Sequence, residues 1–469
     1  MIKKIPMRLR SWSLAGAFLL VSVQAASAQE VFDAGQLRQA IGRAAPGDII
    51  TLMPGRYEIT HIVISTGGTA DRPITLRAPA LGDAKIVPRD DEAFKVAAPH
   101  WIFENLDIAG GPTSDNAFHL VGPASDTIIR HNFIHDFNAM IKGNGEGTPR
   151  TFPNRVLIED NILLDIAPRM VDATVTPIDV VGGKDWVVRS NFIADFGKAG
   201  GDRISYGAYL KGNSSHGVME RNLVLCEWRT HGGTRVGLSL GGGGTGEGFC
   251  DGNSCATEHR DGIIRNNIVA NCPEDVGIYL NKAEDTRILG NTLFDTNGID
   301  VRFPVTSAKI DGNIISGGIR SRDGGAVHDG DNLQFGSSMS LAEHKGFERL
   351  KAKLLHLANE HPRLFHRTWA EWLAGPIDWT SRLFGALSLG RGDNGMQALF
   401  EGAEHENFTL RPSVEGPGNA MPDIVEDFCG YHRNTLYPSY GAIERRDEDC
   451  YVPLVMLRAE GLIVRDQAQ

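Results

Sequence analysis

Short apolar segments that end in asparagine recur along the first two thirds of this chain. The asparagines are Asn105, Asn132, Asn161, Asn191, Asn222, Asn267, Asn291 and Asn313, at steps of 27, 29, 30, 31, 45, 24 and 22 residues. Most are followed directly by a second apolar stretch, as in Ile162-Leu-Leu164. A repeat of this length, with β-type alternation on both sides of a bend, is typical of a solenoid whose coils stack on one another.

The repeat predicts an all-β protein with the fold of a right-handed parallel β-helix. In such a fold each asparagine side chain can bond the equivalent asparagine of the next coil and the local backbone, so that the asparagines form a buried ladder. We therefore interpret these asparagines as structural. The glycine content, 55 of 469 residues, agrees with a chain that makes many tight turns.

The two ends of the chain depart from the repeat. Residues 34–44 place Leu37 and Ile41 on one helical face, which predicts a capping helix over the first coil. From about residue 340 the apolar spacing becomes helical, and Phe408-Thr-Leu-Arg then predicts a return to the coil. The predicted division is a signal peptide (1–28), a parallel β-helix (29–337), a helical excursion (338–403) and a closing coil with a C-terminal tail (404–469).

The first 28 residues have the pattern of a secretory signal. The positive end holds Lys3, Lys4, Arg8 and Arg10, the apolar run is Leu14 to Val23, and Ala26-Ser27-Ala28 offers small residues for cleavage. The run is too short to span a bilayer, so we expect a periplasmic or secreted protein without stable membrane insertion. The formal net charge of −11 argues against a nucleic-acid partner.

Six cysteines suit an oxidising compartment. Sequence alone allows fifteen pairings, of which we predict Cys250–Cys255, Cys226–Cys272 and Cys429–Cys450. The alternative, a zinc site, is disfavoured because the chain contains no Cys-x-x-Cys pair.

A further strand can be aligned in each coil, and its outward residues stack into a column. The column reads His119, Met140/Lys142, Asp179, Tyr209/Lys211, Ser239/Gly241, Tyr279/Asn281 and Asp300/Arg302. Glycines at 241–244, 246 and 248 leave bare backbone beside it. We interpret this strip as the floor of a groove in which an extended polymer can lie; a solvated strand face with a flexible loop is the alternative.

Such a groove on an exported protein suits the breakdown of an acidic polysaccharide by β-elimination. That reaction needs a base to remove the proton beside the carboxylate, and positive charge or hydrogen bonds to stabilise the anion that forms. A lysine among other cations and partly desolvated has a lowered pKa and can be the base. We predict Lys211 as the base and Tyr209 as the proton donor. The predicted substrate-binding residues are Lys142, Asp179, Arg229, His231, Tyr279, Asn281, Arg302 and His119, with His216 as a further candidate.

The sequence resembles the chondroitinase-B/alginate-lyase family of parallel β-helix polysaccharide lyases. The resemblance lies in Leu37 to Tyr57, in Asp71-Arg-Pro-Ile-Thr-Leu-Arg-Ala78, and in the closing segments Asp427 to Arg433 and Tyr440 to Glu444. It implies the same fold, and it places Lys211, in Tyr209-Leu-Lys-Gly-Asn-Ser-Ser215, where the family has its catalytic lysine.

Two family features are replaced. Gly241 stands where the family has its catalytic arginine, and Ile204 and Tyr206 stand where an acidic pair would hold calcium. The family's calcium-assisted mechanism therefore does not carry over. Either cations elsewhere, such as Arg229 or Arg302, replace the metal, or the same coil carries a different chemistry. No cofactor is predicted, although Asp323, Asp329 and Asp331 in a glycine-rich loop leave calcium possible.

Three other functions stay open. A uronan C5-epimerase would begin with the same proton removal. A glycoside hydrolase would need paired carboxylates, and Asp179 and Asp300 lie several coils apart in the alignment, too far for a retaining pair. A non-catalytic polysaccharide-binding or surface β-helix is the third. The polymer, the cleavage mode and the oligomeric state are not set by the sequence.

Overall fold

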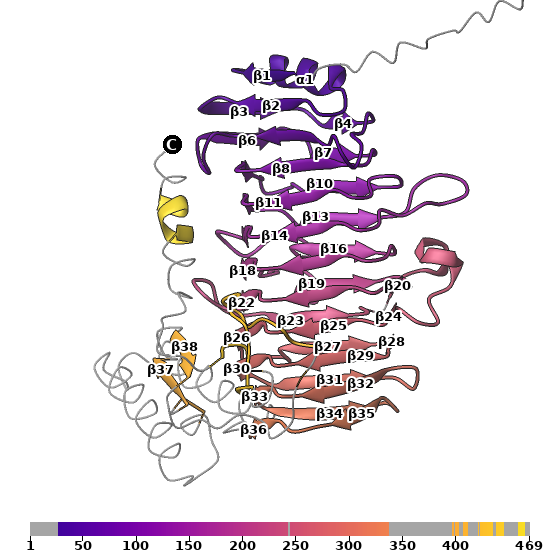
Figure 1. Cartoon of the computed structure of the whole chain (residues 1–469), viewed down its shortest axis with the longest axis vertical. Coiled ribbons are helices and arrows are strands. Elements are labelled where there is room, and N and C mark those ends of the chain that lie inside the picture. Colours follow the sequence, from indigo (N-terminus) through magenta and orange to yellow (C-terminus); the bar gives the residue numbers. More distant parts are fainter. Residues whose placement is uncertain are drawn as a thin grey trace, which may run out of the picture.

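In the computed structural model the chain forms three long parallel sheets that stack as a right-handed β-helix (Figure 1). The structure describes residues 27–336, apart from residue 243, and the segments 396–397, 399–402, 407–410, 421, 423–434, 438–444 and 458–464. Each full coil passes through sheet A, then sheet B, then sheet C, and every pairing within these sheets is parallel. The predicted all-β, right-handed parallel β-helix is confirmed.

Sheet A contains β1 (Ala28–Val31), β2 (Ile49–Leu52), β5 (Ile74–Arg77), β8 (Trp101–Glu104), β11 (Ile128–Arg130), β14 (Leu157–Glu159), β17 (Val187–Arg189), β21 (Val218–Glu220), β25 (Ile263–Arg265), β29 (Thr286–Leu289), β32 (Ser307–Asp311) and β35 (Ala326–Asp329). Sheet B contains β3 (Gly55–Ile59), β6 (Ala84–Pro88), β9 (Asp107–Ala109), β12 (Phe133–His135), β15 (Ile162–Leu164), β18 (Phe192–Ala194), β22 (Leu223–Leu225), β26 (Ile268–Cys272), β30 (Thr292–Thr296), β33 (Ile314–Ser316) and β36 (Leu333–Phe335). Sheet C contains β4 (Ile62–Ile64), β7 (Glu92–Val96), β10 (Asn116–Val121), β13 (Ala139–Asn144), β16 (Ile178–Val181), β19 (Ile204–Lys211), β23 (Thr234–Leu240), β27 (Ile278–Asn281), β31 (Gly298–Arg302) and β34 (Gly318–Arg322).

The smaller elements are the strands β20 (Ser214–Ser215), β24 (His259–Arg260) and β28 (Ala283–Glu284), which form a three-stranded sheet, the short helices η1 (Glu247–Phe249) and η2 (Asp251–Asn253), and the antiparallel pair β37 (Phe400–Gly402) and β38 (Asn407–Leu410).

The predicted asparagine ladder runs through the bend between sheets A and B. Each rung accepts hydrogen bonds from the backbone and side chain of the preceding rung; Asn191, for example, accepts from Asn161 N at 3.0 Å and from Asn161 Nδ2 at 3.0 Å. The ladder starts at Asn132 and continues past Asn313 to Asn332, a rung that the sequence reading missed.

Asn105 was wrongly predicted as a rung. The ladder position in its coil is Leu106, whose backbone N–H donates to Asn132 Oδ1 at 2.9 Å. Asn105 instead lies one residue earlier, at φ 60°, where His131 and Asp160 also have positive φ. Asparagine tolerates this left-handed conformation better than most residues, so Asn105 makes the bend without joining the ladder.

The predicted N-terminal cap is present as helix α1 (Ala34–Arg43). Asp33 caps its first turn by accepting from Gln36 N at 2.8 Å, and Leu37, Ala40 and Ile41 are buried against the first coil. A hydrophobic side chain at each of these positions closes the open end of the coil's apolar interior.

The three sheets have different outer faces, and this difference positions the candidate site. Sheet A carries ion pairs between neighbouring coils, such as Arg189 Nη2 to Glu159 Oε2 at 2.7 Å. From β15 to β26 the outer face of sheet B is apolar; on β15, for example, Ile162 and Leu164 are buried just as the inward Leu163 is. Sheet C has polar and charged outward residues, considered below.

The C-terminal segments cover the apolar outer face of sheet B. Phe400, Phe408, Leu410 and Tyr440 pack in one cluster with sheet B residues, as do the buried side chains of a helical segment over 458–464. Phe408 therefore does not return to the coil as predicted: β38 pairs antiparallel with β37 beside sheet B (Figure 1). Most of the predicted helical excursion and residues 1–26 of the predicted signal peptide lie outside the described residues.

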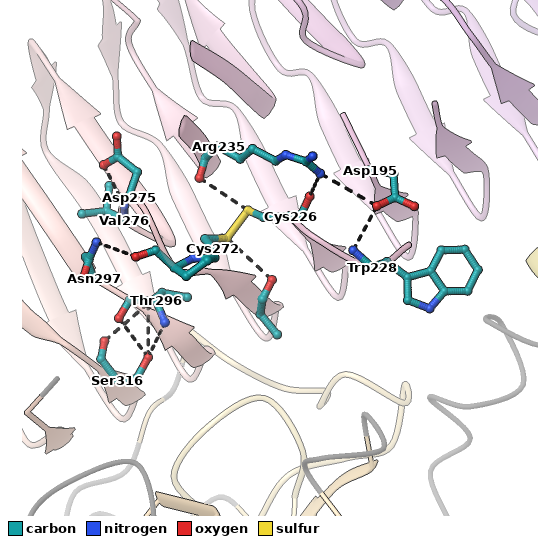
Figure 2. Close-up of a disulfide and its surroundings, with 12 residues drawn as sticks. Asp195, Cys226, Trp228, Arg235, Cys272, Asp275, Val276, Thr296, Asn297 and Ser316 are labelled. Atoms are coloured by element: carbon teal, nitrogen blue, oxygen red, sulfur yellow. Dashed lines mark hydrogen bonds and ion pairs between the residues drawn. A yellow bond between two sulfur atoms is a disulfide. The ribbon is translucent and has the colours of Figure 1, made fainter. Parts of the chain in front are cut away.

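Two of the three predicted disulfides are confirmed. Cys226–Cys272 joins neighbouring coils with a Cα–Cα distance of 5.0 Å, and Figure 2 shows it beside the buried Arg235. Cys250–Cys255 closes the loop after β23 with a Cα–Cα distance of 5.7 Å. Cys450 lies outside the described residues. Among the helices that are described, none is long and apolar enough to cross a membrane.

Candidate functional site

The predicted column of outward residues exists along sheet C. The register of neighbouring strands aligns Lys95, His119, Lys142, Asp179, Tyr209, Ser239, Tyr279, Asp300 and Arg320. Met140 was wrongly placed on this face, because its side chain is fully buried in the core of the coil. The column is also less exposed than a solvated strand face, since Asp179, Tyr209, Tyr279 and Asp300 are all buried.

Four of the predicted residues meet at the ends of β13, β16 and β19. Lys142 Nζ lies 2.8 Å from Asp179 Oδ2, an ion pair between adjacent coils. Tyr209 follows Asp179 in the next coil, and Lys211 Nζ lies 4.3 Å from the centre of the Tyr209 ring. Among the residues that the structure describes, Lys211 has no ion-pair partner, and its ammonium group contacts the aromatic face instead. Such a contact holds a cation in place at a modest gain in free energy.

Burial controls the protonation of this Lys142–Asp179–Tyr209–Lys211 cluster. The pKa of the Lys211 amine is lowered, first by burial and further by the like charge of Lys142, against the opposing effects of Asp179 and Glu258. The pKa of the Tyr209 hydroxyl is raised well above its ordinary value, because the side chain is buried and lies near the Asp179 carboxylate. Burial therefore destabilises the charged forms of both side chains relative to the same groups in water.

Glycine is required next to Lys211 for steric reasons. Gly241 has φ 70°, and a Cβ atom there would overlap the carbonyl oxygen of Asn281. A Cβ at Gly242 would lie 2.9 Å from Lys211 Cδ. The arginine that the resemblance would place at position 241 therefore cannot stand there without rebuilding the backbone. The close approach of Gly242 also helps to bury the Lys211 stem.

A second polar cluster lies further along sheet C. Tyr279 Oη accepts from Asn281 Nδ2 at 3.1 Å and from Arg302 Nη1 at 3.3 Å. Arg302 also donates to Asp323 Oδ2 at 2.5 Å, and this pairing raises the pKa of the guanidinium. Arg302 is three coils beyond Lys211 in the register, about 14 Å at the usual strand spacing. These three predicted residues are brought together, but away from Lys211.

The predicted carboxylates Asp179 and Asp300 are four coils apart, about 19 Å. Asp300 is buried and bound by Arg320 and Arg322. Both retaining and inverting glycosidases place their two carboxyl groups within about 10 Å of each other. This pair therefore does not form a glycosidase site.

His119 lies on the same face, one coil before Lys142. Its Nδ1 is 2.7 Å from Glu92 Oε1, and its Nε2 is 2.6 Å from Asn144 Oδ1. Both ring nitrogens are engaged, which fits an orienting or binding role better than proton transfer.

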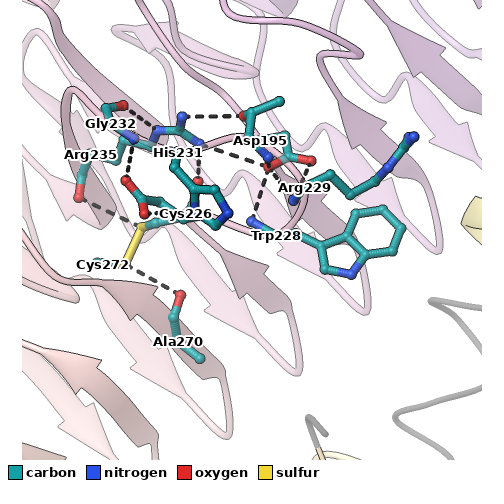
Figure 3. A network of polar contacts seen from close by, with 11 residues as sticks. Asp195, Cys226, Trp228, Arg229, His231, Gly232, Arg235, Ala270 and Cys272 are labelled. Atoms are coloured by element: carbon teal, nitrogen blue, oxygen red, sulfur yellow. Dashed lines mark hydrogen bonds and ion pairs between the residues drawn. A yellow bond between two sulfur atoms is a disulfide. The ribbon is translucent and has the colours of Figure 1, made fainter. Parts of the chain in front are cut away.

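Arg229 and His231 lie at the other edge of sheet C, in the turn that precedes β23 (Figure 3). Asp195 holds this turn by accepting from the backbone N–H groups of Trp228 and Arg229 at 3.0 Å. The start of β23 pairs with Ile204, seven residues before Lys211, or about 23 Å along the strand. The structure therefore does not bring these two predicted residues to Lys211.

His216 and its neighbourhood have a structural explanation. The exposed His216 lies 3.7 Å from Asp261 and 3.9 Å from Asp185. Nearby, His259 Nδ1 is 2.7 Å from Ser214 Oγ, and His259 Nε2 accepts from Gly217 N at 3.3 Å. With Nε2 accepting, a neutral His259 donates to Ser214 and cannot act as its base.

The predicted calcium ligands each have a protein partner. Asp323 pairs with Arg302, Asp329 accepts from Asn332 Nδ2 at 2.9 Å, and the Asp331 carboxylate accepts from the Tyr440 hydroxyl. Within the described part of the chain, no group of three or more acidic, histidine or cysteine side chains is arranged to hold a metal ion. The expectation of no cofactor, with calcium possible, stays a prediction.

Two residues near Lys211 were missed by the sequence reading. Glu258 is buried, accepts from Gly212 N at 2.7 Å and opposes the lowering of the Lys211 pKa. Tyr206 packs edge-on against Tyr209, with ring centres 5.4 Å apart, and burial raises its pKa to about 12. Strict alternation along β19 places Tyr206 on the opposite face from Tyr209, so the strand pattern did not predict their contact. Glu258 comes from a loop without a repeat signal.

Comparisons with known proteins agree with the architecture. The sequence matches no protein-family profile and no curated protein. Similar solved structures include an alginate lyase from Paenibacillus sp. str. FPU-7 (15% identity, 66% of this chain and 97% of that one, TM-score 0.36). They also include a pectate lyase (14% identity, 87% and 90%, TM-score 0.47) and the A-module of a mannuronan C-5 epimerase from Azotobacter vinelandii (13% identity, 65% and 96%, TM-score 0.41).

These likenesses confirm the predicted resemblance to β-helix polysaccharide lyases as a similarity. At such low identities and TM-scores they carry no argument about chemistry, and the fold rests on the three parallel sheets themselves.

Proposed function

We propose that the protein is an exported polysaccharide lyase that cleaves a uronate-containing polysaccharide by β-elimination, with Lys211 as the base. The observation that carries the proposal is the Lys211 amine: it has no ion-pair partner among the described residues, lies on the Tyr209 ring, and has a lowered pKa. The predicted signal peptide and the disulfides support a periplasmic or secreted location.

In the proposed reaction, neutral Lys211 removes the proton beside the uronate carboxylate. The electron pair of that C–H bond forms the new C=C double bond, and the bond to the leaving glycosidic oxygen breaks. The leaving oxygen then takes a proton, so the products are one unsaturated end and one ordinary end. Arg302, three coils beyond Lys211 on sheet C, supplies positive charge for an acidic polymer, whereas Lys142 is held in its ion pair with Asp179.

Tyr209 has a different role in this proposal from the proton donor expected from the sequence. Its side chain is only 2% exposed, and its hydroxyl lies near Asp179, away from an approaching polymer. We assign it as a positioning residue that carries Lys211 on its ring. The Lys211 ammonium, formed in the first step, then returns the proton to the leaving oxygen.

The test is a screen of the purified mature protein on alginate, pectate and glycosaminoglycans, following ultraviolet absorbance of unsaturated ends together with reducing ends. Lys211→Met keeps the apolar stem on the ring and should abolish turnover, whereas Lys309→Met, an exposed lysine of sheet A, should not. Tyr209→Phe keeps the ring and should retain most activity. Loss of activity in this variant would indicate that the Tyr209 hydroxyl is the proton donor after all.

An epimerase shares the first step, and proton exchange with solvent without unsaturated ends would identify it. Binding of a polymer with neither reaction would show a non-catalytic module. Because Lys211 must be neutral to act, the acidic limb of kcat/KM should titrate below 10.5, the ordinary pKa of lysine.

A further inference from the structure

Two loops project from the same side of the coil and meet beside Lys211. One spans 145–151 and follows β13; the other spans 241–258, follows β23 and contains η1 and η2 (Figure 1). Between their coils lie β16 and β19, the strands of Asp179 and Lys211, whose own connections to the next strand are short. The two long loops therefore stand on either side of the strand ends that carry the candidate site.

The loops touch through one pair of side chains. The Arg150 guanidinium carbon lies 5.1 Å from the centre of the Phe249 ring. Both residues are exposed, and Phe249 keeps 62% of its surface open to solvent. The contact joins loops that leave strands three coil steps apart, about 14 Å at the usual strand spacing, and β19 with Lys211 is one of the two strands between them.

Local bonds fix the Phe249 loop close to Lys211. The loop begins at Gly241 and Gly242, against the Lys211 stem, and it returns where Asp251 N donates to Gly212 O at 2.9 Å. Cys250, directly after Phe249, is disulfide-bonded to Cys255. The Phe249 ring is thus held in a solvent-exposed position by a disulfide-closed turn. An exposed apolar ring gains no burial free energy and so does not stabilise the fold.

We propose that Phe249 and Arg150 form a sugar-binding subsite for a unit of an acidic polysaccharide next to Lys211. The apolar C–H face of a sugar ring packs on the open face of Phe249, and the sugar carboxylate pairs with the Arg150 guanidinium, which is suited to planar carboxylates. This inference rests on the proposed function for its ligand class, but it concerns binding and not the chemical step.

The experiment measures binding of polygalacturonate and alginate oligosaccharides by calorimetry, and kcat and KM on the polymer that the screen identifies. Phe249→Ala and Arg150→Ala should each weaken binding and raise KM about three- to tenfold, with kcat at saturation changed less than about twofold. Arg150→Ala should also reduce the salt dependence of binding. Phe32→Ala is the matched control, since Phe32 is 63% exposed and lies beside the N-terminal cap.

The outcomes separate the two proposals. If Phe249→Ala and Arg150→Ala bind like the wild type while Lys211→Met loses turnover, the subsite is refuted and the lyase proposal stands. If the wild type binds an acidic oligosaccharide without cleaving it, and both variants lose that binding, the subsite stands and the lyase proposal is refuted. Equal losses in Phe32→Ala and Phe249→Ala would also refute the subsite, because they would reflect a general effect of removing an exposed ring.

Discussion

Replacing Asn191 by alanine should test whether the asparagine ladder holds the coils together. The Asn191 side chain is 1% exposed and makes four hydrogen bonds: its Oδ1 accepts from Asn161 N and Nδ2 at 3.0 Å, and its Nδ2 donates to Ile158 O at 2.9 Å and to Asn222 Oδ1 at 3.0 Å. Alanine makes none of them, and water cannot reach the site. A buried group left unsatisfied costs about 1–3 kcal/mol. With Asn161 N and Ile158 O affected, we expect a loss of about 2–5 kcal/mol.

The assay is urea unfolding followed by circular dichroism, combined with hydrogen exchange of the coils around Asn191. The control is Asn105→Gly, which removes an asparagine outside the ladder and tolerates φ 60°; it should cost less than about 1.5 kcal/mol. Asn191→Asp has the same shape but cannot donate to Asn222 Oδ1, so it should destabilise at neutral pH and recover partly in acid, when the carboxyl is protonated. An Asn191→Ala protein within about 1 kcal/mol of the wild type would refute the reasoning.

Three further predictions concern stability. Burial raises the pKa of Asp165 well above 3.8, so the folded state binds the proton more tightly than the unfolded state does. The free energy of unfolding should therefore fall by about 1.4 kcal/mol per pH unit as pH rises from 3.8 toward the folded pKa. Asp165→Asn should remove this slope, and parallel melting profiles of both proteins against pH would contradict the prediction. Replacing Cys226 and Cys272, 46 residues apart, by serine should cost about 2–4 kcal/mol in denaturant unfolding, and an unchanged midpoint would count against a structural role. A chelator should leave Tm within about 1 °C, because Asp323 and Asp329 have protein partners; a clear drop would show bound calcium.

The coil architecture could be predicted because it repeats. One bend and one strand pair per coil fix the asparagine positions, and the same period aligns Lys142, Asp179 and Tyr209 on sheet C. The prediction that Asn105 is a rung of the ladder was wrong because two adjacent positions of the bend both favour asparagine. One position makes the ladder, and the other has a left-handed backbone. The period alone does not separate neighbouring positions of a turn.

Features made by loops and by distant segments were harder to predict. The cover over sheet B had a signal that alternation would have shown: β15 and β22 are apolar at three consecutive positions, which indicates burial on both faces. Glu258 and Phe249 had none, because they lie in a single long insertion between β23 and β24. Tyr209 was expected to be an accessible proton donor, and its burial changed the role assigned to it.

Because position 241 is glycine and not arginine, positive charge for a substrate has to come from the two ion pairs on either side of Lys211. Lys142 is bound to Asp179, whose side chain is only 6% exposed, so withdrawing Lys142 would leave a buried carboxylate uncompensated. Arg302 is bound to Asp323, whose side chain is 52% exposed and can return to water at little cost. A polyanion in the groove can therefore exchange places with Asp323 much more easily than with Asp179. In the proposed lyase, Arg302 is therefore the cation free to turn to a substrate, while Lys142 stays with Asp179.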